Sequence, residues 1–369
     1  MNREFKNFLF MLGALTLWFS RPAAAAESST ANPSGEAADS GHIVVPAIPG
    51  VPKMFLPDIG IAGDFAFERQ NLQKSDPRYV SEQPRIRDGM AIFYEPIDPY
   101  TNAQFTIDLP ENGTANILEA WVYFNKLPGN TSIRLGRYAP RFGLLDLLNT
   151  LQLPMVDRPN AIANYLSPGG VTGTGLEANA YIPNPWDWNL KWNVNAVSGD
   201  ALQGTANTDL TYMSTLDYSS DLFTSGSFET GVSVAQGPSP VGQSEFLEDP
   251  YIQFQYAPTQ RKIWTWSTEG MLAQRRGQGS HNDTGGVYTF LDYNFALRYH
   301  VGLLLDLADQ AVAPYGKQLG FGPNATWFLS DNMRLRLQYT HTTALGSDKP
   351  EEKVSLQATF SLGNLKQLN

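Results

Sequence analysis

Four basic side chains lie on the polar face of segments in which polar and apolar residues alternate. Arg334 and Arg336 are separated by one apolar residue, so in an extended chain both point to the same side. Lys353 lies on the polar face of the next alternating segment, and Arg134 lies much earlier in the chain. Guanidinium groups bind phosphate and carboxylate groups through paired hydrogen bonds. The set therefore predicts a basic strip that attracts anions.

The same polar faces also carry acidic residues, which offers a second interpretation. Arginines opposite carboxylates form ion pairs that brace a protein wall and leave only a weak field. The acidic residues expected on these faces are Asp108, Glu119, Glu177, Asp217, Glu229 and Glu269. Anion selectivity and structural ion pairing both remain open at this point.

A second group of charges belongs to a long segment that alternates poorly. Residues 143–170 are interrupted by Pro154, Pro159 and Pro168. An irregular insert of this length is uncommon in a compact domain and is usually functional. Charges of both signs at such a loop could meet a solute or could pin the loop to its surroundings. The charged residues in and just before the segment are Arg137, Arg141, Asp146, Asp157 and Arg158.

Several classes of chemistry have no support in the sequence. The chain has no cysteine and four scattered histidines, so neither a disulfide framework nor a cysteine-based metal site is expected. No GxSxG, HExxH or P-loop pattern is present. The acidic balance, with a formal net charge of −10, argues against nucleic-acid binding. We predict a protein that is not an enzyme and uses no cofactor or metal.

The elements that must position these charges read as β-strands. Clean period-two alternation occurs in residues 102–109, 116–125, 190–196, 332–341 and 353–362. One face of each strand is therefore apolar and the other polar. A soluble β-sandwich and a membrane β-barrel both satisfy this pattern, so alternation alone does not separate them.

The lengths of the connections favour the barrel, because short and long gaps tend to alternate. Outer-membrane barrels have short periplasmic turns, long external loops and an even number of strands. The sequence predicts an all-β transmembrane antiparallel β-barrel of about sixteen strands, in which residues 143–170 form the third external loop. The expected strands are 58–68, 89–95, 102–109, 116–126, 131–142, 171–182, 189–197, 209–218, 226–235, 250–256, 262–273, 287–294, 299–307, 319–328, 332–342 and 353–362.

The beginning of the chain predicts export. Residues 1–26 combine basic residues, a short apolar run and Ala23–Ala26, as in a secretory signal peptide. Removing them takes away three basic residues and one acidic residue, which changes the net charge to −12. Residues 27–56 are small, polar and proline-rich, and we expect a flexible periplasmic leader. The barrel is then expected over residues 57–369.

The stretch from Glu95 to Leu176 resembles the phosphate-selective-porin-like outer-membrane proteins of Gram-negative bacteria. The resemblance rests on EPIDPYTNAQFTIDLP, LEAWVYFNKLP, IRLGRYAPRFG, LPMVDRP and TGTGLEANAYIPNPW, and on the final LQATFSLGNL. It implies a passive channel whose third external loop folds inward and narrows the pore. It also implies a possible homotrimer. Many relatives carry a His-x-His element before the Leu-Pro of LPMVDRP, but Asn149 and Leu151 stand here, so we predict no metal site.

Three hypotheses follow. The favoured one is an outer-membrane porin for passive diffusion of small hydrophilic solutes, with a weak anion preference. The second is a plugged barrel that acts as a receptor or adhesin, and the third is a secreted soluble β-sandwich. The expected partners are outer-membrane lipid and small hydrophilic or anionic solutes. The expected pore-lining residues are Arg134, Arg137, Arg141, Asp146, Asp157, Arg158, Arg334, Arg336, Lys353 and Glu119.

Overall fold

The computed structural model describes most of the chain beyond residue 56. The described residues are 57–72, 82–111, 113–146, 148–166, 169–186, 188–198, 202, 209–222, 224–238, 244–277, 280–309, 316–344 and 350–363. The predicted signal peptide and leader lie outside these ranges. Among the described residues, no helix is long and apolar enough to cross a membrane.

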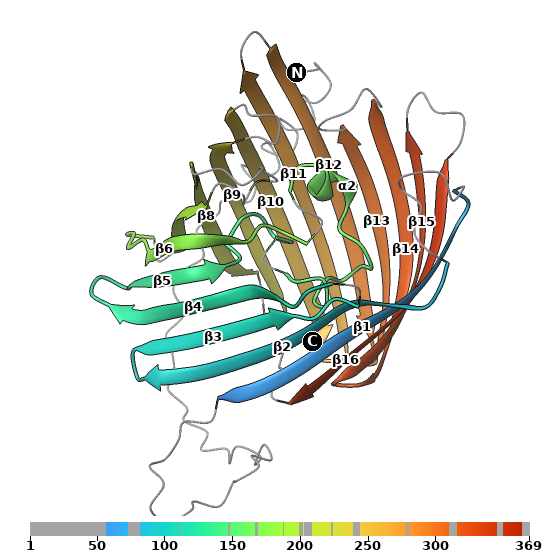
Figure 1. The fold of residues 1–369 in the computed structure, drawn as a ribbon, viewed down its shortest axis with the longest axis horizontal. Helices are drawn as coiled ribbons and strands as arrows, with labels where there is room; N and C mark the ends of the chain where they lie inside the picture. The colour runs from blue at the N-terminus through green and yellow to red at the C-terminus, as the bar shows by residue number, and fades with distance from the viewer. Residues whose placement is uncertain are drawn as a thin grey trace, which may run out of the picture. The chain divides into compact units, whose positions relative to one another are not determined.

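Sixteen antiparallel strands form a closed barrel, which confirms the predicted fold and strand number (Figure 1). The strands are β1 (Asp58–Gln70), β2 (Arg85–Asp98), β3 (Thr101–Asp108), β4 (Asn116–Leu127), β5 (Thr131–Tyr138), β6 (Gly173–Tyr181), β7 (Asn189–Ser198), β8 (Leu210–Leu222), β9 (Gly226–Pro238), β10 (Ser244–Thr259), β11 (Lys262–Gly277), β12 (Ser280–Phe295), β13 (Tyr299–Asp309), β14 (Lys317–Ser330), β15 (Met333–Ala344) and β16 (Glu351–Gly363).

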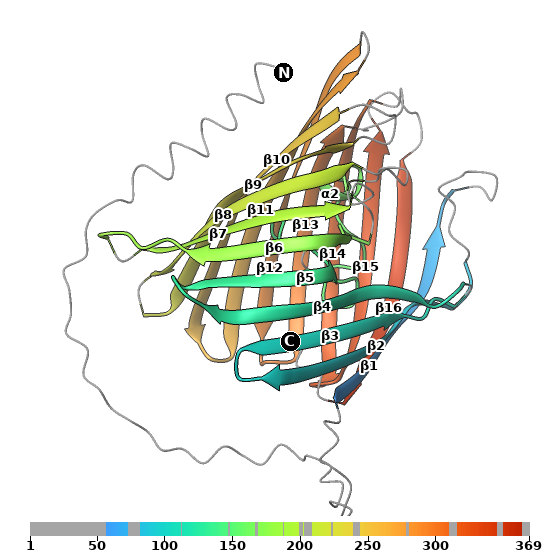
Figure 2. The ribbon, with the colours of Figure 1, turned by 60° about the vertical axis from the view of Figure 1, so that its left-hand side comes forward.

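Each strand pairs with its neighbours in sequence, and β1 closes the ring by pairing with β16. Gly60 lies opposite Gly363, so the first and last strands meet at the same end of the barrel. Most of the short hairpin turns lie at that end, and most of the longer connections lie at the other (Figure 2). The two-residue connection between β11 and β12 is an exception at the second end. By the usual arrangement of outer-membrane barrels, the end with the short turns faces the periplasm.

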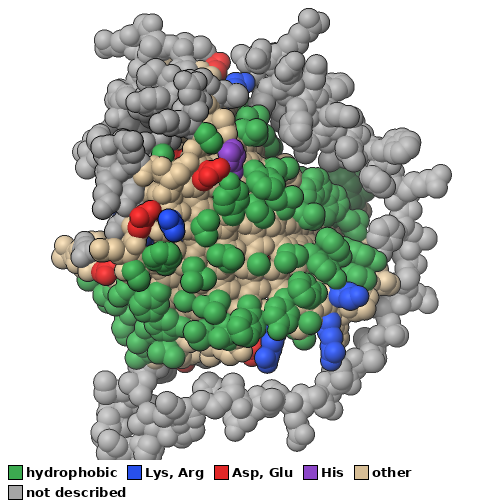
Figure 3. Space-filling view, turned by 90° about the vertical axis from the view of Figure 1, so that its right-hand side faces the viewer, with side chains coloured by type: hydrophobic (Ala, Val, Ile, Leu, Met, Phe, Trp, Pro, Cys, Tyr) green, Lys and Arg blue, Asp and Glu red, His purple; other side chains and the backbone are tan. Residues whose placement is uncertain are grey.

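The two faces of each strand differ as the alternation predicted. On β14, Leu319, Phe321 and Trp327 are exposed on the outside of the barrel, whereas Asn324 and Thr326 are buried inside it. A space-filling view shows hydrophobic side chains spread over the outer face (Figure 3). An apolar exterior around a polar interior is the arrangement of a membrane barrel. It contradicts the soluble sandwich, whose apolar faces would meet inside.

Several strands are longer than the sequence indicated. Residues 236–249 and 274–286 were expected to be loops, yet β10 begins at Ser244, β11 continues to Gly277 and β12 begins at Ser280. These ends lack clean apolar alternation, although their backbones continue the hydrogen-bonded ladder. Conversely, β5 ends at Tyr138, shortly before Pro140, which has no N–H to donate to the ladder.

A bulge in β4 changes which way one side chain points. The pairing of β3 with β4 shifts by one residue between Thr106 and Ile107. Leu118 therefore packs inward against a small apolar cluster that includes Met90 and Leu151, although strict alternation places it outside. Glu119, the next residue, still hydrogen-bonds to lumen-facing Gln104.

Candidate functional site

The chain between β5 and β6, residues 139–172, folds into the lumen of the barrel. We call this segment the insert. Its described residues include a short helix, α2 (Asn160–Ala163), which lies inside the ring of strands and contacts β11, β12 and β13 (Figure 1). Pro159 precedes the helix as its N-cap residue and makes no side-chain capping bond. The helix therefore depends on the barrel wall for partners.

Apolar contacts fix one side of the insert. Its side chains Phe142, Met155 and Ile162 are fully buried. They belong to one cluster with inward-facing residues of the barrel, among them Met213 and Tyr288. Such apolar residues facing the lumen are unusual for a water-filled barrel, whose interior is polar. Here they form an apolar surface, on the wall formed by β7 to β13, against which the insert packs.

On the opposite wall, arginine side chains of β15 hold the insert through its backbone carbonyl groups. Arg336 donates to the carbonyl oxygens of Leu153 and Met155, at 2.9 Å each. Arg334 donates to the carbonyl oxygen of Leu151. Both arginine residues are buried, each only 3% exposed. The predicted basic strip is therefore covered, and its donors are used for docking.

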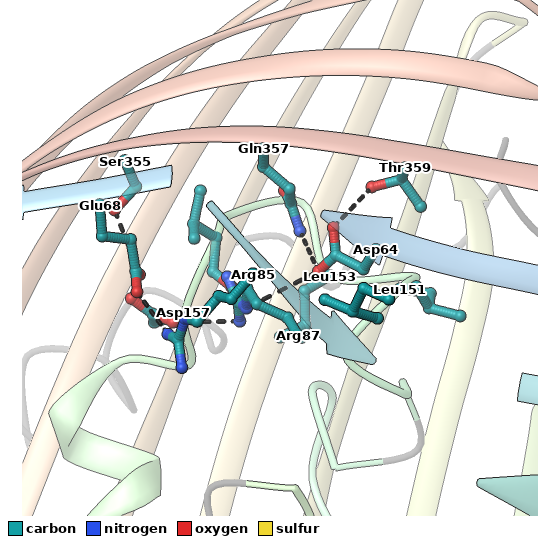
Figure 4. A network of polar contacts seen from close by, with 12 residues as sticks. Asp64, Glu68, Arg85, Arg87, Leu151, Leu153, Asp157, Ser355, Gln357 and Thr359 are labelled. Atoms are coloured by element: carbon teal, nitrogen blue, oxygen red, sulfur yellow. Dashed lines mark hydrogen bonds and ion pairs between the residues drawn. The ribbon is translucent and has the colours of Figure 1, made fainter. Parts of the chain in front are cut away.

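A network of ion pairs continues this wall across β16, β1 and β2 (Figure 4). The Asp157 carboxylate of the insert lies 2.5 Å from Lys353 Nζ and 3.2 Å from Arg87 Nη2. Arg87 also donates to the carbonyl oxygen of Val156 at 3.0 Å. Glu68 pairs with Arg85 and lies 3.8 Å from Lys353. The wall thus holds the insert through both its backbone and one of its carboxylates.

The wall formed by β11 and β13 holds the insert through carboxylates that accept backbone N–H groups. Asp306 accepts from Asn160 at 2.6 Å and from Ala161 at 2.9 Å, at the start of α2. Glu269 accepts from Leu144 at 2.9 Å. These carboxylates supply the partners that a helix N-terminus and a tight turn leave unsatisfied.

Gly143 brings the insert very close to two buried carboxyl groups. Its φ angle is +63°, a left-handed conformation that glycine adopts without strain. A Cβ atom at this position would lie 1.9 Å from Glu269 Oε1 and 2.4 Å from Asp249 Oδ2. The Tyr288 hydroxyl donates to the other oxygen of Glu269 at 2.7 Å. A side chain at position 143 would therefore push the insert off this wall.

Two further contacts tie the start of the insert to the barrel. Arg141 Nε lies 2.7 Å from Asp217, and its Nη2 lies 2.6 Å from Glu229. Glu119 accepts from the N–H of Ala139 at 3.4 Å. Of the predicted pore-lining residues, Arg141 and Glu119 thus serve as anchors of the insert.

Asp146 and Arg158 lie near one another within the insert itself. Asp146 is 2% exposed and accepts the N–H of Val171 at 2.7 Å. Burial raises the pKa of Asp146 to about 7, although the nearby Arg158 guanidinium and the Val171 N–H act in the opposite direction. Arg158 donates to the carbonyl oxygens of Leu145 and Leu148. These two residues therefore hold the insert's own fold and do not line a passage.

Arg134 and Arg137, both on β5, point to opposite faces of the barrel. Arg134 faces the lumen and pairs with Glu177. Arg137 shares the outer face with Leu135, which is 43% exposed, and donates to the carbonyl oxygen of Ile117 at 3.1 Å. The prediction that Arg137 lines the pore is therefore wrong. Its spacing of three from Arg134 places it on the other side of the strand.

The sequence reading missed other residues of the site. Arg87 and Asp306 hold the insert, yet neither was among the predicted pore-lining residues. The sequence LLLDLAD, residues 303–309, could have indicated Asp306, because this residue is a charge within an apolar run. Lys191 on β7 was also missed, although it lies on the polar face there. Within the part of the chain that the structure describes, no group of three or more His, Cys, Asp or Glu side chains is arranged to hold a metal ion.

Comparison with known proteins supports the fold. No protein-family model matches the chain. An uncharacterized protein of Aquifex aeolicus is 25% identical over 154 residues, which cover 36% of this chain and 32% of that protein. The chain thus matches about a third of that relative's length.

Solved structures of outer-membrane channels are similar over most of the barrel. The anion-selective porin from Comamonas acidovorans superposes with a TM-score of 0.58 at 11% identity, covering 82% of this chain and 98% of that one. The channel DcaP of Acinetobacter baumannii gives 0.56 at 12% identity, covering 83% and 96%. OmpF of Salmonella typhi gives 0.53 at 10% identity, covering 83% and 98%. The chain thus has the fold of these outer-membrane channels, and a specific kinship with phosphate-selective porins is not confirmed.

Proposed function

We propose that this barrel is a porin through which small hydrophilic solutes diffuse passively beside the docked insert. The observation that carries the proposal is the insert itself, which is held inside the lumen by both walls. In this function, the insert narrows the passage and sets the size of solute that crosses. Asp157 and Lys353, which meet at the edge of the insert, are the charged pair that we place at the narrowing. Passive diffusion requires no catalytic group.

A second candidate is a plugged barrel that acts as a receptor or adhesin. It is favoured by the number of strands that the insert contacts. Leu151 packs against residues of β1 and β2, Arg141 reaches β8 and β9, and α2 packs on β12 and β13. A segment held from so many sides could close the lumen.

Removal of the insert distinguishes the two candidates. We expect wild-type protein in planar lipid bilayers to give discrete conductance steps, and a variant lacking residues 144–166 to give larger ones. A plugged barrel would instead give no steps as wild type and would conduct after the deletion. The channel function is contradicted if neither protein conducts although both insert into the bilayer.

The weak anion preference needs a positive charge that solutes can reach. Arg334 and Arg336 do not provide it, because both are buried beneath the insert. Lys191 is half-buried on the lumen face of β7 and makes no ion pair or hydrogen bond with any described residue. We therefore assign the preference to Lys191. In a KCl gradient, Lys191→Gln should shift the reversal potential toward cation selectivity, whereas Arg137→Gln, on the outer face, should leave it unchanged.

We also propose that the barrel assembles as a homotrimer through its wall of short strands. β3 and β5 have eight residues each. At a tilt of 45° such strands span only about 19 Å, less than the apolar band of about 25 Å. Arg137 lies on the outer face of this wall, where contact with lipid is costly. Chemical cross-linking in detergent should give a trimer, which Arg137→Glu weakens; a monomer at all concentrations contradicts the proposal.

A further inference from the structure

Three cationic side chains gather at the short-turn end of the barrel. Arg261 belongs to the turn between β10 and β11, Lys262 is the first residue of β11, and Arg298 belongs to the turn between β12 and β13. All three are exposed. We call them the rim cluster. The two turns are joined, because the N–H of Ala296 donates to the carbonyl oxygen of Arg261 at 3.0 Å.

The rim cluster is not neutralised by the barrel. None of its three side chains forms an ion pair or hydrogen bond with a described residue. Asp331, in the turn between β14 and β15, is exposed and forms no ion pair with these three side chains. The chain as a whole carries a net charge of −10, so three free cations in adjacent turns are a local exception.

Aromatic rings stack in a row directly above the rim cluster. Trp264 lies 4.0 Å from Tyr293 between ring centroids, and Phe295 lies 5.5 Å from Tyr299. Tyr293 and Phe295 are 5.7 Å apart, and Trp327 extends the row from Tyr299 at 6.4 Å. Rings of this kind on the outside of a barrel mark the depth of the lipid headgroups.

The cations and the rings share one outward face. Lys262 is two residues from Trp264 on β11 and lies opposite Phe295 of β12. The N–H of Phe328, next to Trp327, donates to the carbonyl oxygen of Arg298 at 2.8 Å. Figure 3 shows Lys or Arg side chains at the lower edge of the apolar outer face. Long basic side chains at this depth extend along the rings and reach the phosphate level.

We propose that the rim cluster and the aromatic row above it bind anionic phospholipid of the periplasmic leaflet. The phosphate of the headgroup would meet Arg261, Lys262 and Arg298, while the acyl chains lie on Trp264 and its neighbouring rings. Guanidinium and ammonium groups bind phosphate strongly, and each cation near an anionic bilayer adds to the attraction. The interaction would fix the barrel's depth on the side of β10 to β14.

Lipid binding by the intact barrel tests the proposal. The delipidated protein in neutral detergent is titrated with phosphatidylglycerol or phosphatidylcholine, and bound lipid is counted by native mass spectrometry. We expect phosphatidylglycerol to bind about tenfold more tightly than phosphatidylcholine, and this preference to disappear in Arg261→Gln/Lys262→Gln/Arg298→Gln. Inorganic phosphate at the same concentration should not displace the lipid, because it lacks the acyl chains.

A matched control removes the same charge at the other end of the barrel. Arg69, Arg276 and Lys317 are exposed near the ends of β1, β11 and β14 that lie opposite the short-turn end. Their triple glutamine variant should keep the preference for phosphatidylglycerol. Equal losses in both variants, or equal binding of both lipids by wild type, overturn the proposal. Binding of the wild-type protein to isolated cell-wall sacculi, together with no preference between the two lipids, would likewise overturn it. That result would indicate a cell-wall polymer as the partner. As a control for folding, the difference in gel mobility between unheated and heated protein should be the same in wild type and in both variants.

Discussion

The two walls of the lumen hold the same insert with opposite chemistry. On β15 and β2, guanidinium groups donate to backbone carbonyl oxygens of the insert. On β11 and β13, carboxylates accept backbone N–H groups. We refer to these as the basic wall and the acidic wall. The exception is the N–H of Val156, which donates to neutral Gln338 on the basic wall at 2.7 Å.

The charged side chains of both walls serve to hold the insert in place. A guanidinium group bound to carbonyl oxygens beneath a loop cannot bind a passing anion. Charges that the sequence offers for selectivity serve here to position a backbone. The walls also differ in response to pH, since carboxylates titrate in an accessible range and arginine does not.

Loss of the basic wall should have the largest effect. Arg334→Ala/Arg336→Ala leaves the carbonyl groups of Leu151, Leu153 and Met155 without their donors. Hydrogen bonds to charged groups contribute about 1.5 to 3 kcal/mol each, so docking of this segment should be lost. Hydrogen exchange of residues 151–156 should accelerate by at least about a hundredfold. Arg137→Ala, on the outer face, should leave the exchange unchanged, and equal effects of the two variants contradict the role of the basic wall.

The closest contact of the acidic wall is tested by adding one methyl group. Gly143→Ala places a Cβ between Glu269 and Asp249 and strains a left-handed backbone. Gly129→Ala imposes similar backbone strain at φ +79°, with no atom closer than 4.0 Å to the new Cβ. Thermal unfolding in detergent should show a clearly larger loss for Gly143→Ala, because only it displaces the insert. If both variants lose the same free energy of unfolding, about 1 to 2 kcal/mol, backbone strain alone would account for the effect.

The pH dependence of docking should follow Asp146. Burial raises its pKa from 3.8 to about 7, so between these values the docked insert binds a proton that an undocked one does not. Docking should therefore be strongest below pH 4 and should weaken as the pH rises to 7. Exchange of the Val171 amide, measured from pH 5 to pH 8 and corrected for intrinsic rates, reports this change. Asp146→Asn should flatten the profile.

Other groups around Asp146 bear on that measurement. Arg158 of the insert and Glu269, Asp249 and Tyr288 of the barrel surround this side of the insert. Glu269→Gln serves as the comparison, because it changes the wall and leaves Asp146 in place. A profile that is flattened by Glu269→Gln and not by Asp146→Asn would assign the dependence to the wall.

The smallest expected effect is at the start of α2. Asp306→Asn keeps one acceptor oxygen for the two N–H groups of Asn160 and Ala161 but removes the charge. Loss of a capping acceptor typically costs about 1 kcal/mol. Exchange of the Ala161 amide should accelerate by about fivefold to tenfold, while exchange of residues 151–156 stays unchanged. Acceleration at both places would mean that the two walls are not independent.

Much of the fold could be predicted from the sequence because a membrane barrel repeats one simple pattern. Alternation along residues 353–362 and the sorting of loop lengths gave the strands, their number and the position of the insert. A bulge cannot be seen this way, since one extra residue at Leu118 reverses the side on which it lies. The opposite orientations of Arg134 and Arg137 could have been read from their spacing.

The docking of the insert could not be predicted for a different reason. Arg336 binds the carbonyl oxygens of Leu153 and Met155, which are far from it in sequence. Every residue carries a carbonyl group, so no residue type marks these partners. The sequence could show that Arg336 faces the lumen, but only the folded path of the insert shows that it is covered.

We propose that solutes pass while the insert stays docked between the two walls. The chain has no cysteine, so thiols at Asp157→Cys and Lys353→Cys can be joined by a short bifunctional reagent without side reactions. Single-channel conductance is then measured before and after cross-linking. We expect discrete steps of nearly the same size in both states, because docking and conduction coexist. Loss of conductance on cross-linking, with recovery when the linker is cleaved, would show that the insert must undock from the wall before solutes can pass.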